Sequence, residues 1–322
     1  MIVGVSRAAG RWWRRAVVAL LALHGVAVGA QAPRTNAPAK PAAFTHADTT
    51  ALRRTLDSIS DAHHGVVGYA VVNMETGERL SRRGDEPFPT ASLIKVPIAV
   101  ALMEQVKAGQ ISLDDRMTVL RIEKVPGAGI LQFMHDGAEV TVHDAAWLML
   151  TLSDNTATNL LLSRVEMRRV WEAMEKRGLP RTKVHSKVFL RLASVAPDSS
   201  VKYGLGVSTP NEMARLFALL ADGKAVSPAA DSVVMEMLDH NDDGQLLQRF
   251  VDGIRAPHKT GATDEVRTEC AVFYLQTRVV ACAFTRENVD QRWLIDSEAQ
   301  RTMAEIGRAV TSAWPRLQAP RP

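Results

Sequence analysis

Three short motifs carry residue types that together could catalyse acyl transfer. In chain order they are Ser92-Leu93-Ile94-Lys95, Ser153-Asp154-Asn155 and Lys259-Thr260-Gly261. Each string alone is short enough to arise by chance. Their order, and the helix or strand expected around each one, indicate an enzyme with a serine nucleophile. We therefore expect this chain to form a covalent acyl-enzyme.

Ser92 is the candidate nucleophile and Lys95 is the candidate base. They lie three residues apart at the start of an expected helix, so their side chains share one face. A lysine can accept the serine proton if burial or a neighbouring cation, here Lys259, lowers its pKa. Pro97 removes a helical hydrogen bond, which predicts a turn tighter than an α-helix around Ser92. The alternative is an ordinary helix start, but the apolar stretch 91–100 would then bury a lysine without a reason.

The second motif is expected at a break between two helices. Ser153 could relay a proton toward the leaving nitrogen, and the Asn155 amide could orient the substrate. Asp154 is expected to brace the turn. Helix capping alone is the alternative explanation for all three residues.

The third motif lies on an expected strand. Lys259 and Thr260 offer a charge and a hydroxyl to a substrate carboxylate. Gly261 is expected to keep one strand edge open to a substrate backbone. The backbone N–H groups of Ser92 and Ala262 are the candidate oxyanion hole.

Two residues beside the third motif have open roles. Arg267, on the next strand, is a candidate second ligand for the substrate carboxylate, and a solvated arginine on a sheet edge is the alternative. His258 could tune the neighbouring lysine, although a histidine inside a strand is more often structural.

The elements that must position these residues follow from hydrophobic periodicity and turn signals. Helices are expected at 45–62, 91–107, in pieces over 143–177, from 209, from 227 and at 294–314; strands are expected at 66–74, 78–81, 256–261, 266–275 and 278–284. The stretch 180–208 shows no sustained period, and loops of that length are usually functional. The predicted fold class is α/β (α+β), an antiparallel sheet of about five strands flanked by terminal helices, with an all-helical insertion.

The domain organisation follows from this order. Residues 45–91 and 209–318 are predicted to form an α/β subdomain, and residues 92–208, including the loop 180–208, a helical subdomain. Residues 1–32 have the layout of a secretory signal peptide, and 33–44 read as a flexible leader. We therefore expect an exported protein, periplasmic or secreted, with no stable membrane anchor after cleavage.

Charge and cysteine content exclude or limit other classes. The formal net charge is +4, but the predicted signal peptide carries four arginines and no acid, so a mature charge near zero argues against a nucleic-acid partner. Cys270 and Cys282 are the two cysteines. In an oxidising compartment they could pair, but a hairpin turning at Gln276-Thr277 would place Cys282 opposite Ala271, which favours two buried free thiols. A monomer is expected, since no interface stripe is evident.

With these motifs the chain resembles the class A β-lactamases, members of the penicillin-recognising serine enzymes. The resemblance runs from about residue 45 to 316 and includes the stretch 154–161 and Ser208-Thr209-Pro210. It implies a β-lactamase/transpeptidase-like fold, Ser92 as nucleophile, Lys95 as its proton acceptor, and no metal or cofactor. The nine histidines also include no metal-binding string such as His-Glu-x-x-His.

One departure from the family concerns deacylation. Class A β-lactamases carry Glu-x-x-Leu-Asn in a loop after the second motif, and its glutamate activates the hydrolytic water. This chain has Arg191 to Ser194 where that glutamate should fall, and Asp198 is the single acid between Arg181 and Asn211. Glu166 lies too soon after the second motif to replace it.

Three functions follow as hypotheses. A β-lactamase is favoured by the overall resemblance, and a D,D-carboxypeptidase or transpeptidase acting on peptidoglycan stem peptides is favoured by the missing glutamate. A non-catalytic binding module is disfavoured because the three motifs are intact. The predicted substrate is accordingly a β-lactam or a D-Ala-D-Ala peptide.

Overall fold

The computed structural model describes residues 46–314, so the predicted signal peptide and leader lie outside the described residues. A five-stranded sheet has the order β2-β1-β10-β9-β8, and every neighbouring pair is antiparallel. Its strands are β1 (Val66–Asn73), β2 (Arg79–Arg82), β8 (His258–Thr263), β9 (Val266–Tyr274) and β10 (Arg278–Arg286). The predicted sheet of about five strands is confirmed, and β8 with the third motif forms one edge.

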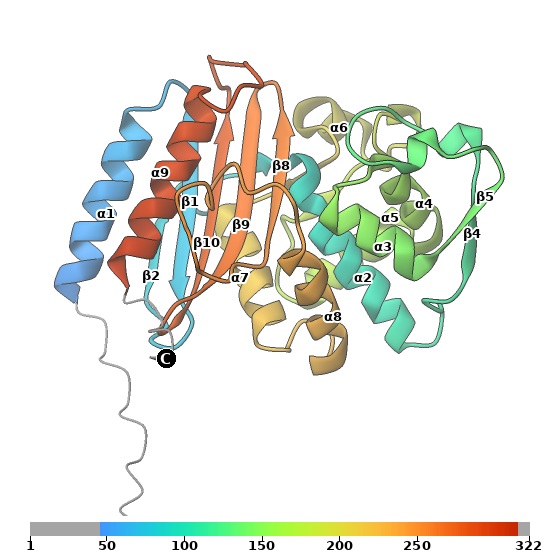
Figure 1. Ribbon diagram of the computed structural model, residues 1–322, viewed down its shortest axis with the longest axis horizontal. Coiled ribbons are helices and arrows are strands. Elements are labelled where there is room, and N and C mark those ends of the chain that lie inside the picture. Colours follow the sequence, from blue (N-terminus) through green and yellow to red (C-terminus); the bar gives the residue numbers. More distant parts are fainter. Residues whose placement is uncertain (1–45, 315–322) are drawn as a thin grey trace, which may run out of the picture. The chain divides into compact units, whose positions relative to one another are not determined.

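Helices cover both faces of this sheet (Figure 1). The terminal helices α1 (His46–Asp61) and α9 (Glu298–Ala313) pack side by side on one face, and α7 (Pro210–Ala221) packs on the other. Because side chains alternate along a strand, Tyr69 and Val71 join the core under α1 and α9, whereas Ala70 and Val72 join the core that includes α7. The central strand β1 is therefore apolar at nearly every position, as expected for a strand buried on both faces.

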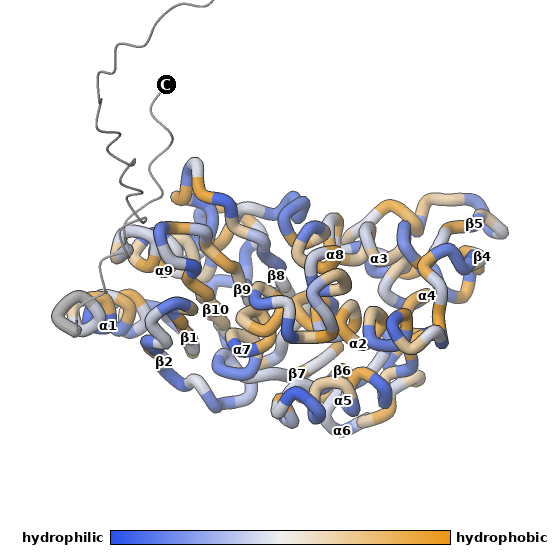
Figure 2. Tube along the Cα trace, turned by 90° about the horizontal axis from the view of Figure 1, so that it is seen from below, coloured by the Kyte–Doolittle hydropathy of each residue, from blue (hydrophilic) through white to orange (hydrophobic). Residues whose placement is uncertain are grey.

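The region between β2 and β8 is mainly helical. Its helices are α2 (Lys95–Lys107), α3 (Val142–Thr151), α4 (Asn155–Val165), α5 (Met167–Lys176), α6 (Pro197–Tyr203), α7 and α8 (Pro228–Asp239). Residues 95–103 of α2 are all buried, so this helix is enclosed on every side. Figure 2 shows α8 and α5 on two sides of α2, and α2 contacts both.

The loop 180–208 and the segment before α3 contain structure that the periodicity did not predict. Short strands form two small sheets, one from β3 (Phe88–Pro89), β7 (Gly206–Ser208) and β6 (Lys183–Val184), the other from β4 (Arg116–Val119) and β5 (Ala138–Thr141). The loop 180–208 also holds α6 and a 3₁₀ turn at Arg191–Ala193. Elements of two to seven residues are too short to show a period, which is why they were missed.

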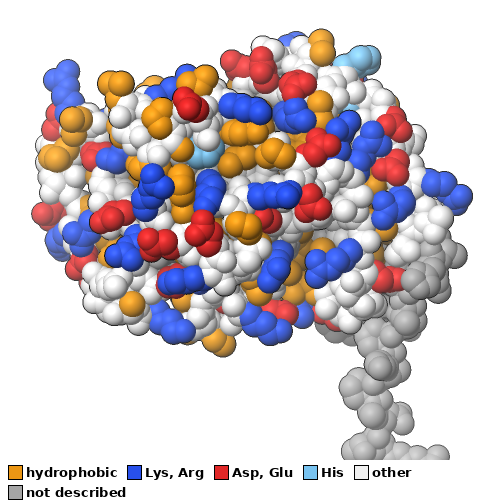
Figure 3. Space-filling model, turned by 180° about the vertical axis from the view of Figure 1, so that it is seen from behind, with side chains coloured by type: hydrophobic (Ala, Val, Ile, Leu, Met, Phe, Trp, Pro, Cys, Tyr) orange, Lys and Arg blue, Asp and Glu red, His pale blue; other side chains and the backbone are white. Residues whose placement is uncertain are grey.

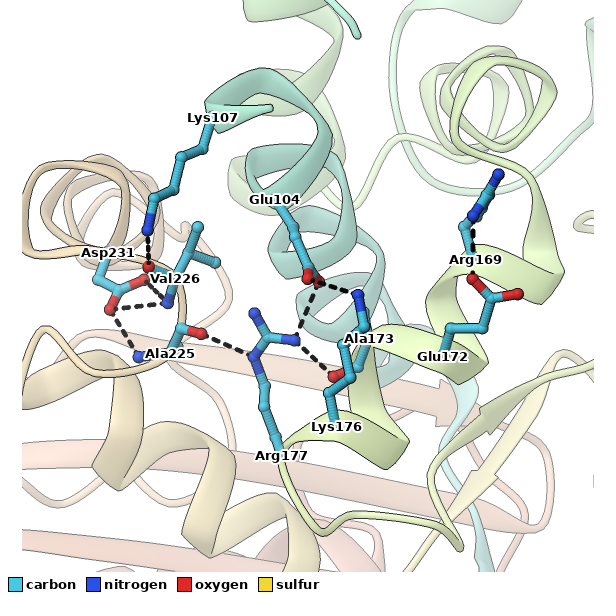
Figure 4. Close-up of polar contacts among 10 residues, drawn as sticks. All are labelled: Glu104, Lys107, Arg169, Glu172, Ala173, Lys176, Arg177, Ala225, Val226 and Asp231. Atoms are coloured by element: carbon cyan, nitrogen blue, oxygen red, sulfur yellow. Dashed lines mark hydrogen bonds and ion pairs between the residues drawn. The ribbon is translucent and has the colours of Figure 1, made fainter. Parts of the chain in front are cut away.

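Hydrogen bonds and ion pairs connect α2 to the end of α5 and to the loop before α8 (Figure 4). Glu104 of α2 accepts hydrogen bonds from Lys176 (3.0 Å) and Arg177 (3.1 Å) at the end of α5. Arg177 Nε also donates to the carbonyl of Ala225 (2.7 Å), in the loop before α8, and Asp231 of α8 accepts from the backbone N–H of the same residue (2.8 Å). The helix that begins with Lys95 is therefore linked directly to the end of α5 and, through Arg177, to the loop before α8.

The two cysteines form a disulfide, so the prediction of free thiols is wrong. Cys270 on β9 pairs directly with Cys282 on β10, with Cα atoms 4.1 Å apart. The hairpin places Tyr274 opposite Arg278, so its loop has three residues rather than two. The extra loop residue shifts the register by one and brings both sulfur atoms to the same face.

Two further observations on the described residues concern the distribution of surface charge and the apolar character of the helices. Figure 3 shows basic and acidic side chains interspersed over the face seen from behind, without a gathering of one sign on its described part. Over residues 46–314, none of the helices combines the length and apolar character that crossing a membrane would require.

Candidate active site

Ser92 lies on a tight turn that leads directly into α2. Residues Ala91–Ile94 form a 3₁₀ helix and Lys95 is the first residue of α2, so the predicted tight turn before Pro97 is confirmed. Ala91 has a φ of 46°, a left-handed conformation that is costly for a residue with a side chain. The backbone strain therefore falls on the residue next to the candidate nucleophile.

Gly261 of β8 allows the strand to approach this turn. A Cβ at this position would lie 2.4 Å from the carbonyl oxygen of Thr90 and 2.8 Å from the backbone nitrogen of Leu93. The Thr268 hydroxyl on β9 donates to the Thr90 carbonyl (2.8 Å) and so connects β9 to the start of the serine turn. The glycine thus serves the contact between β8 and the serine turn, and the strand edge is open because β8 is the last strand of the sheet.

Lys95 is fully buried and points to the second motif. Its Nζ donates to the Ser153 carbonyl (2.5 Å), to the Ser153 hydroxyl (3.1 Å) and to Asn155 Oδ1 (2.9 Å). Burial lowers the pKa of Lys95 well below 10.5, the cation of Lys259 lowers it further, and the carboxylate of Asp154 opposes both. A lysine with a lowered pKa is suited to accept a proton.

The second motif is held in place by Asp154. Its Oδ1 accepts from the backbone N–H of Ala157 (2.8 Å), and its Oδ2 accepts from those of Ile130 (2.7 Å) and Leu131 (2.9 Å). The expectation that this aspartate braces the turn is confirmed. Ser153, just before it, has a φ of 55°.

Asn155, at the start of α4, has both ends of its amide engaged. Its Oδ1 accepts from Lys95 and its Nδ2 donates to the Pro126 carbonyl (3.0 Å). The amide therefore joins the candidate base to the segment around Gly127, which lines the same cavity.

Lys259 is the second buried cation of the site. Its Nζ donates to the Thr260 carbonyl (3.0 Å), and burial lowers its pKa to about 8, although Asp243 and Glu269 act in the opposite sense. The Thr260 hydroxyl donates to Asp243 Oδ2 (2.8 Å). Asp243 was missed in the sequence, where it stands in a polar loop without a recognisable motif.

The His258 side chain contacts the buried carboxylate of Glu269. Its Nδ1 lies 2.6 Å from Glu269 Oε1 on β9, and Glu269 Oε2 accepts from the backbone N–H of Leu247. Burial raises the pKa of Glu269, and the hydrogen bond to His258 opposes that rise. Both side chains are thus part of the packing beneath β8, in keeping with a structural histidine.

Arg267 is buried, with 1% of its surface exposed, so the alternative of a solvated edge arginine is wrong. Its guanidinium donates to the carbonyls of Thr263, Val266 (2.9 Å) and Arg292 (3.3 Å) and lies 4.5 Å from the ring centroid of Trp293. The segment after β10 contributes to its burial through the Arg292 carbonyl and the Trp293 ring. Its role as a carboxylate ligand stays a prediction.

A cavity of about 500 Å³ brings most of the predicted residues together. Its lining consists of Ser92, Gly127, Ala128, Ser153, Asn155, Phe189, Asp243, Thr260, Gly261, Ala262, Thr263, Asp264 and Trp293. Lys95, Lys259 and Arg267 are outside this lining. All three basic side chains are buried and are not part of the cavity surface.

A second cavity, of about 210 Å³, shares Ser92 and Phe189 with the first and is lined by part of the loop 180–208. Lys187 and Arg191 are among its lining residues, and no carboxylate is among the described residues that line it. Asp198 and Glu166 line neither cavity. An arginine thus stands where the family's glutamate was expected.

Over residues 46–314, no group of three or more histidine, cysteine, aspartate and glutamate side chains is placed to hold a metal ion.

The chain is similar to several known proteins. A β-lactamase of Rhodobacter capsulatus is 25% identical over 276 residues, covering 84% of this chain and 91% of that protein. The crystal structure of a β-lactamase from Sphaerobacter thermophilus is 27% identical, with a TM-score of 0.72 over 82% of this chain and 97% of that one. A structure described as PBP-A, 24% identical with a TM-score of 0.73 over 82% and 96% of the two chains, shares the fold. Residues 51–314 match the family described as "Beta-lactamase enzyme family", and the chain belongs to that family.

Proposed function

We propose that this protein is a serine hydrolase that opens the β-lactam amide through an acyl-enzyme on Ser92. The observation that carries the proposal is the state of Lys95, a buried amine with a lowered pKa, three residues from a serine that lines a cavity. A buried lysine needs a reason to persist, and acceptance of the serine proton is one.

The proposed acylation assigns a task to each motif. Lys95 accepts the Ser92 proton as Oγ attacks the lactam carbonyl, and the N–H groups of Ser92 and Ala262 hold the oxyanion. The proton then passes through Ser153, whose hydroxyl lies 3.1 Å from Lys95 Nζ, to the leaving nitrogen. Lys259 contributes a positive field for the substrate carboxylate.

Deacylation requires a water activated by a base. The cavity on the loop side of Ser92 offers Lys187 and Arg191 and no carboxylate among its described lining residues. We therefore expect hydrolysis of the acyl-enzyme to be slow, with Lys95 as the base that serves both steps.

This arrangement also favours a second candidate, a D,D-carboxypeptidase or transpeptidase acting on peptidoglycan D-Ala-D-Ala peptides. Such an enzyme would use the same acylation, and a β-lactam would act as its slowly released inhibitor. The observation that favours it is that Lys187 and Arg191, and no carboxylate among the described lining residues, line the second cavity beside Ser92.

Export, monomeric state and independence of cofactor and nucleic acid complete the proposal. The first is testable by the mass of the mature protein, which should begin near residue 33 when the gene is expressed in a bacterium with an intact secretion pathway. A protein that keeps residues 1–32 would contradict it.

The test of function is a timed mass-spectrometric experiment with benzylpenicillin, which follows both the protein mass and free penicilloate. We expect an adduct on the protein that is absent from Ser92→Ala. An adduct that decays while penicilloate accumulates over many turnovers supports the β-lactamase. An adduct that persists at about one per protein supports the peptidase, and release of D-alanine from a D-Ala-D-Ala peptide then tests it. If no adduct forms, both candidates are wrong.

A further inference from the structure

Trp293 is an exposed tryptophan that is nevertheless fixed in place. It lies in the segment between β10 and α9, and 60% of its surface is exposed. Figure 1 shows this segment at one end of the sheet. Its indole Nε1 donates to Asp264 Oδ1 (2.7 Å). The guanidinium of the buried Arg267 lies 4.5 Å from its ring centroid. Both contacts restrain the ring before any ligand arrives.

The carbonyl of the preceding residue strengthens this restraint. Arg267 donates to the Arg292 carbonyl (3.3 Å), so the same guanidinium holds both the ring and the backbone beside it. A cation stacked on one face of an aromatic ring contributes on the order of 0.5–2 kcal/mol. With one face against Arg267 and most of the residue exposed, the rest of the indole is available for contact.

The available surface of Trp293 lines the cavity that contains Ser92 and Ala262. Phe189, from the loop 180–208, lines the same cavity and is 66% exposed, with a φ of 56°. Two exposed aromatic side chains from distant parts of the chain thus share a cavity with the candidate nucleophile. An exposed aromatic residue held in a strained or anchored geometry has a functional explanation more readily than a packing one.

We infer that Trp293, together with Phe189, forms a subsite for an apolar aromatic side group of the acyl donor, adjacent to the carbonyl that Ser92 attacks. Trp293 is then a residue that determines specificity, and Arg267 and Asp264 position it. This inference rests on the proposed acylation of Ser92. An anchored ring loses little conformational freedom on binding, so the contact contributes to affinity nearly in full.

The test compares two acyl donors that share the lactam core. Benzylpenicillin carries an aromatic side group, and 6-aminopenicillanic acid carries none. The measured quantity is the second-order rate constant for adduct formation, by mass spectrometry, in the wild type, Trp293→Ala and Trp293→Phe. Phe250→Ala is the matched control, because Phe250 is also exposed and stacked by an arginine (Arg249, 5.2 Å) but lines neither cavity beside Ser92.

We expect Trp293→Ala to lower the rate constant for benzylpenicillin about 10-fold and to change that for 6-aminopenicillanic acid less than about 2-fold. Trp293→Phe should retain most of the wild-type preference, and Phe250→Ala should alter neither rate. Equal losses with both donors, or no loss with benzylpenicillin, would overturn the inference.

A binding measurement separates this inference from the proposed function. On the Ser92→Ala background, which cannot be acylated, the dissociation constant of benzylpenicillin should rise about 10-fold with Trp293→Ala. If the wild type forms an adduct but this constant is unchanged, the subsite is wrong and the proposed function stands. If neither donor forms an adduct with the wild type, the proposed function fails and the inference fails with it.

Discussion

Replacing Lys259 with methionine should stabilise the fold and slow acylation. Lys259 is fully buried, and burial lowers its pKa from 10.5 to about 8. At ~1.4 kcal/mol per pKa unit, this difference corresponds to roughly 3 kcal/mol of unfavourable free energy in the folded protein at pH 7. Methionine has a similar length and no charge, but it loses the hydrogen bond to the Thr260 carbonyl, worth about 1 kcal/mol. We therefore expect Lys259→Met to raise the free energy of unfolding by about 2 kcal/mol.

The stabilisation by Lys259→Met should decrease as the pH rises. The folded pKa of Lys259 lies below the unfolded one, so between about pH 8 and 10.5 the unfolded chain binds more protons than the folded chain. Wild-type stability therefore rises with pH through this window. The cost of the buried charge is complete below pH 8 and is lost as pH approaches 10.5, so the advantage of methionine should disappear there.

Urea unfolding followed by circular dichroism at pH 7 and pH 10 measures this difference. Lys202→Met, at an exposed lysine, is the control and should show no such dependence. Acylation of Lys259→Met by benzylpenicillin should also slow, because the cation of Lys259 helps to lower the pKa of Lys95. Destabilisation of Lys259→Met at pH 7, or a difference that does not change with pH, would refute the reasoning.

Three further changes test the contact at Gly261, the turn held by Asp154 and the disulfide, through the acylation rate or the stability of the fold. Gly261→Ala places a Cβ 2.4 Å from the Thr90 carbonyl oxygen, so acylation should slow by about 10-fold or more, whereas Gly244→Ala, with nothing within 4 Å, should leave the rate unchanged. Asp154→Ala leaves three backbone N–H groups without their acceptor, so urea unfolding should give a free energy lower by about 3 kcal/mol. Reduction of the disulfide between β9 and β10, which links residues 12 apart, should lower it by about 3 kcal/mol, seen as a fall in Tm with reductant.

The fold could be predicted from the sequence where elements are long. The five strands of the large sheet are bounded by clear turn signals and the longer helices have clear caps or periods, so their positions were found. The register of the β9–β10 hairpin was not predicted correctly, because it depends on whether Leu275 belongs to the strand or the loop. That one residue decides whether the two cysteines meet.

The candidate site could be predicted where it lies in compact motifs. Ser92, Asn155 and Thr260 line one cavity, and the expected influence of Lys259 on Lys95 is confirmed. Residues that enter from loops could not be found in this way. Trp293 and Asp243 have no motif, and they line the cavity where their side chains bond to Asp264 and Thr260, respectively.

The central claim is that Lys95 is the base that activates Ser92, and the pH dependence of adduct formation tests it most directly. Single-turnover formation of the benzylpenicillin adduct should be measured by quenched mass spectrometry across the stable pH range, in the wild type and in Lys95→Ala. We predict a wild-type rate that rises with a midpoint well below pH 10.5 and a Lys95→Ala rate lower by at least ~100-fold. A midpoint near 10.5, or an adduct that forms on Ser92 at the wild-type rate without Lys95, would contradict it.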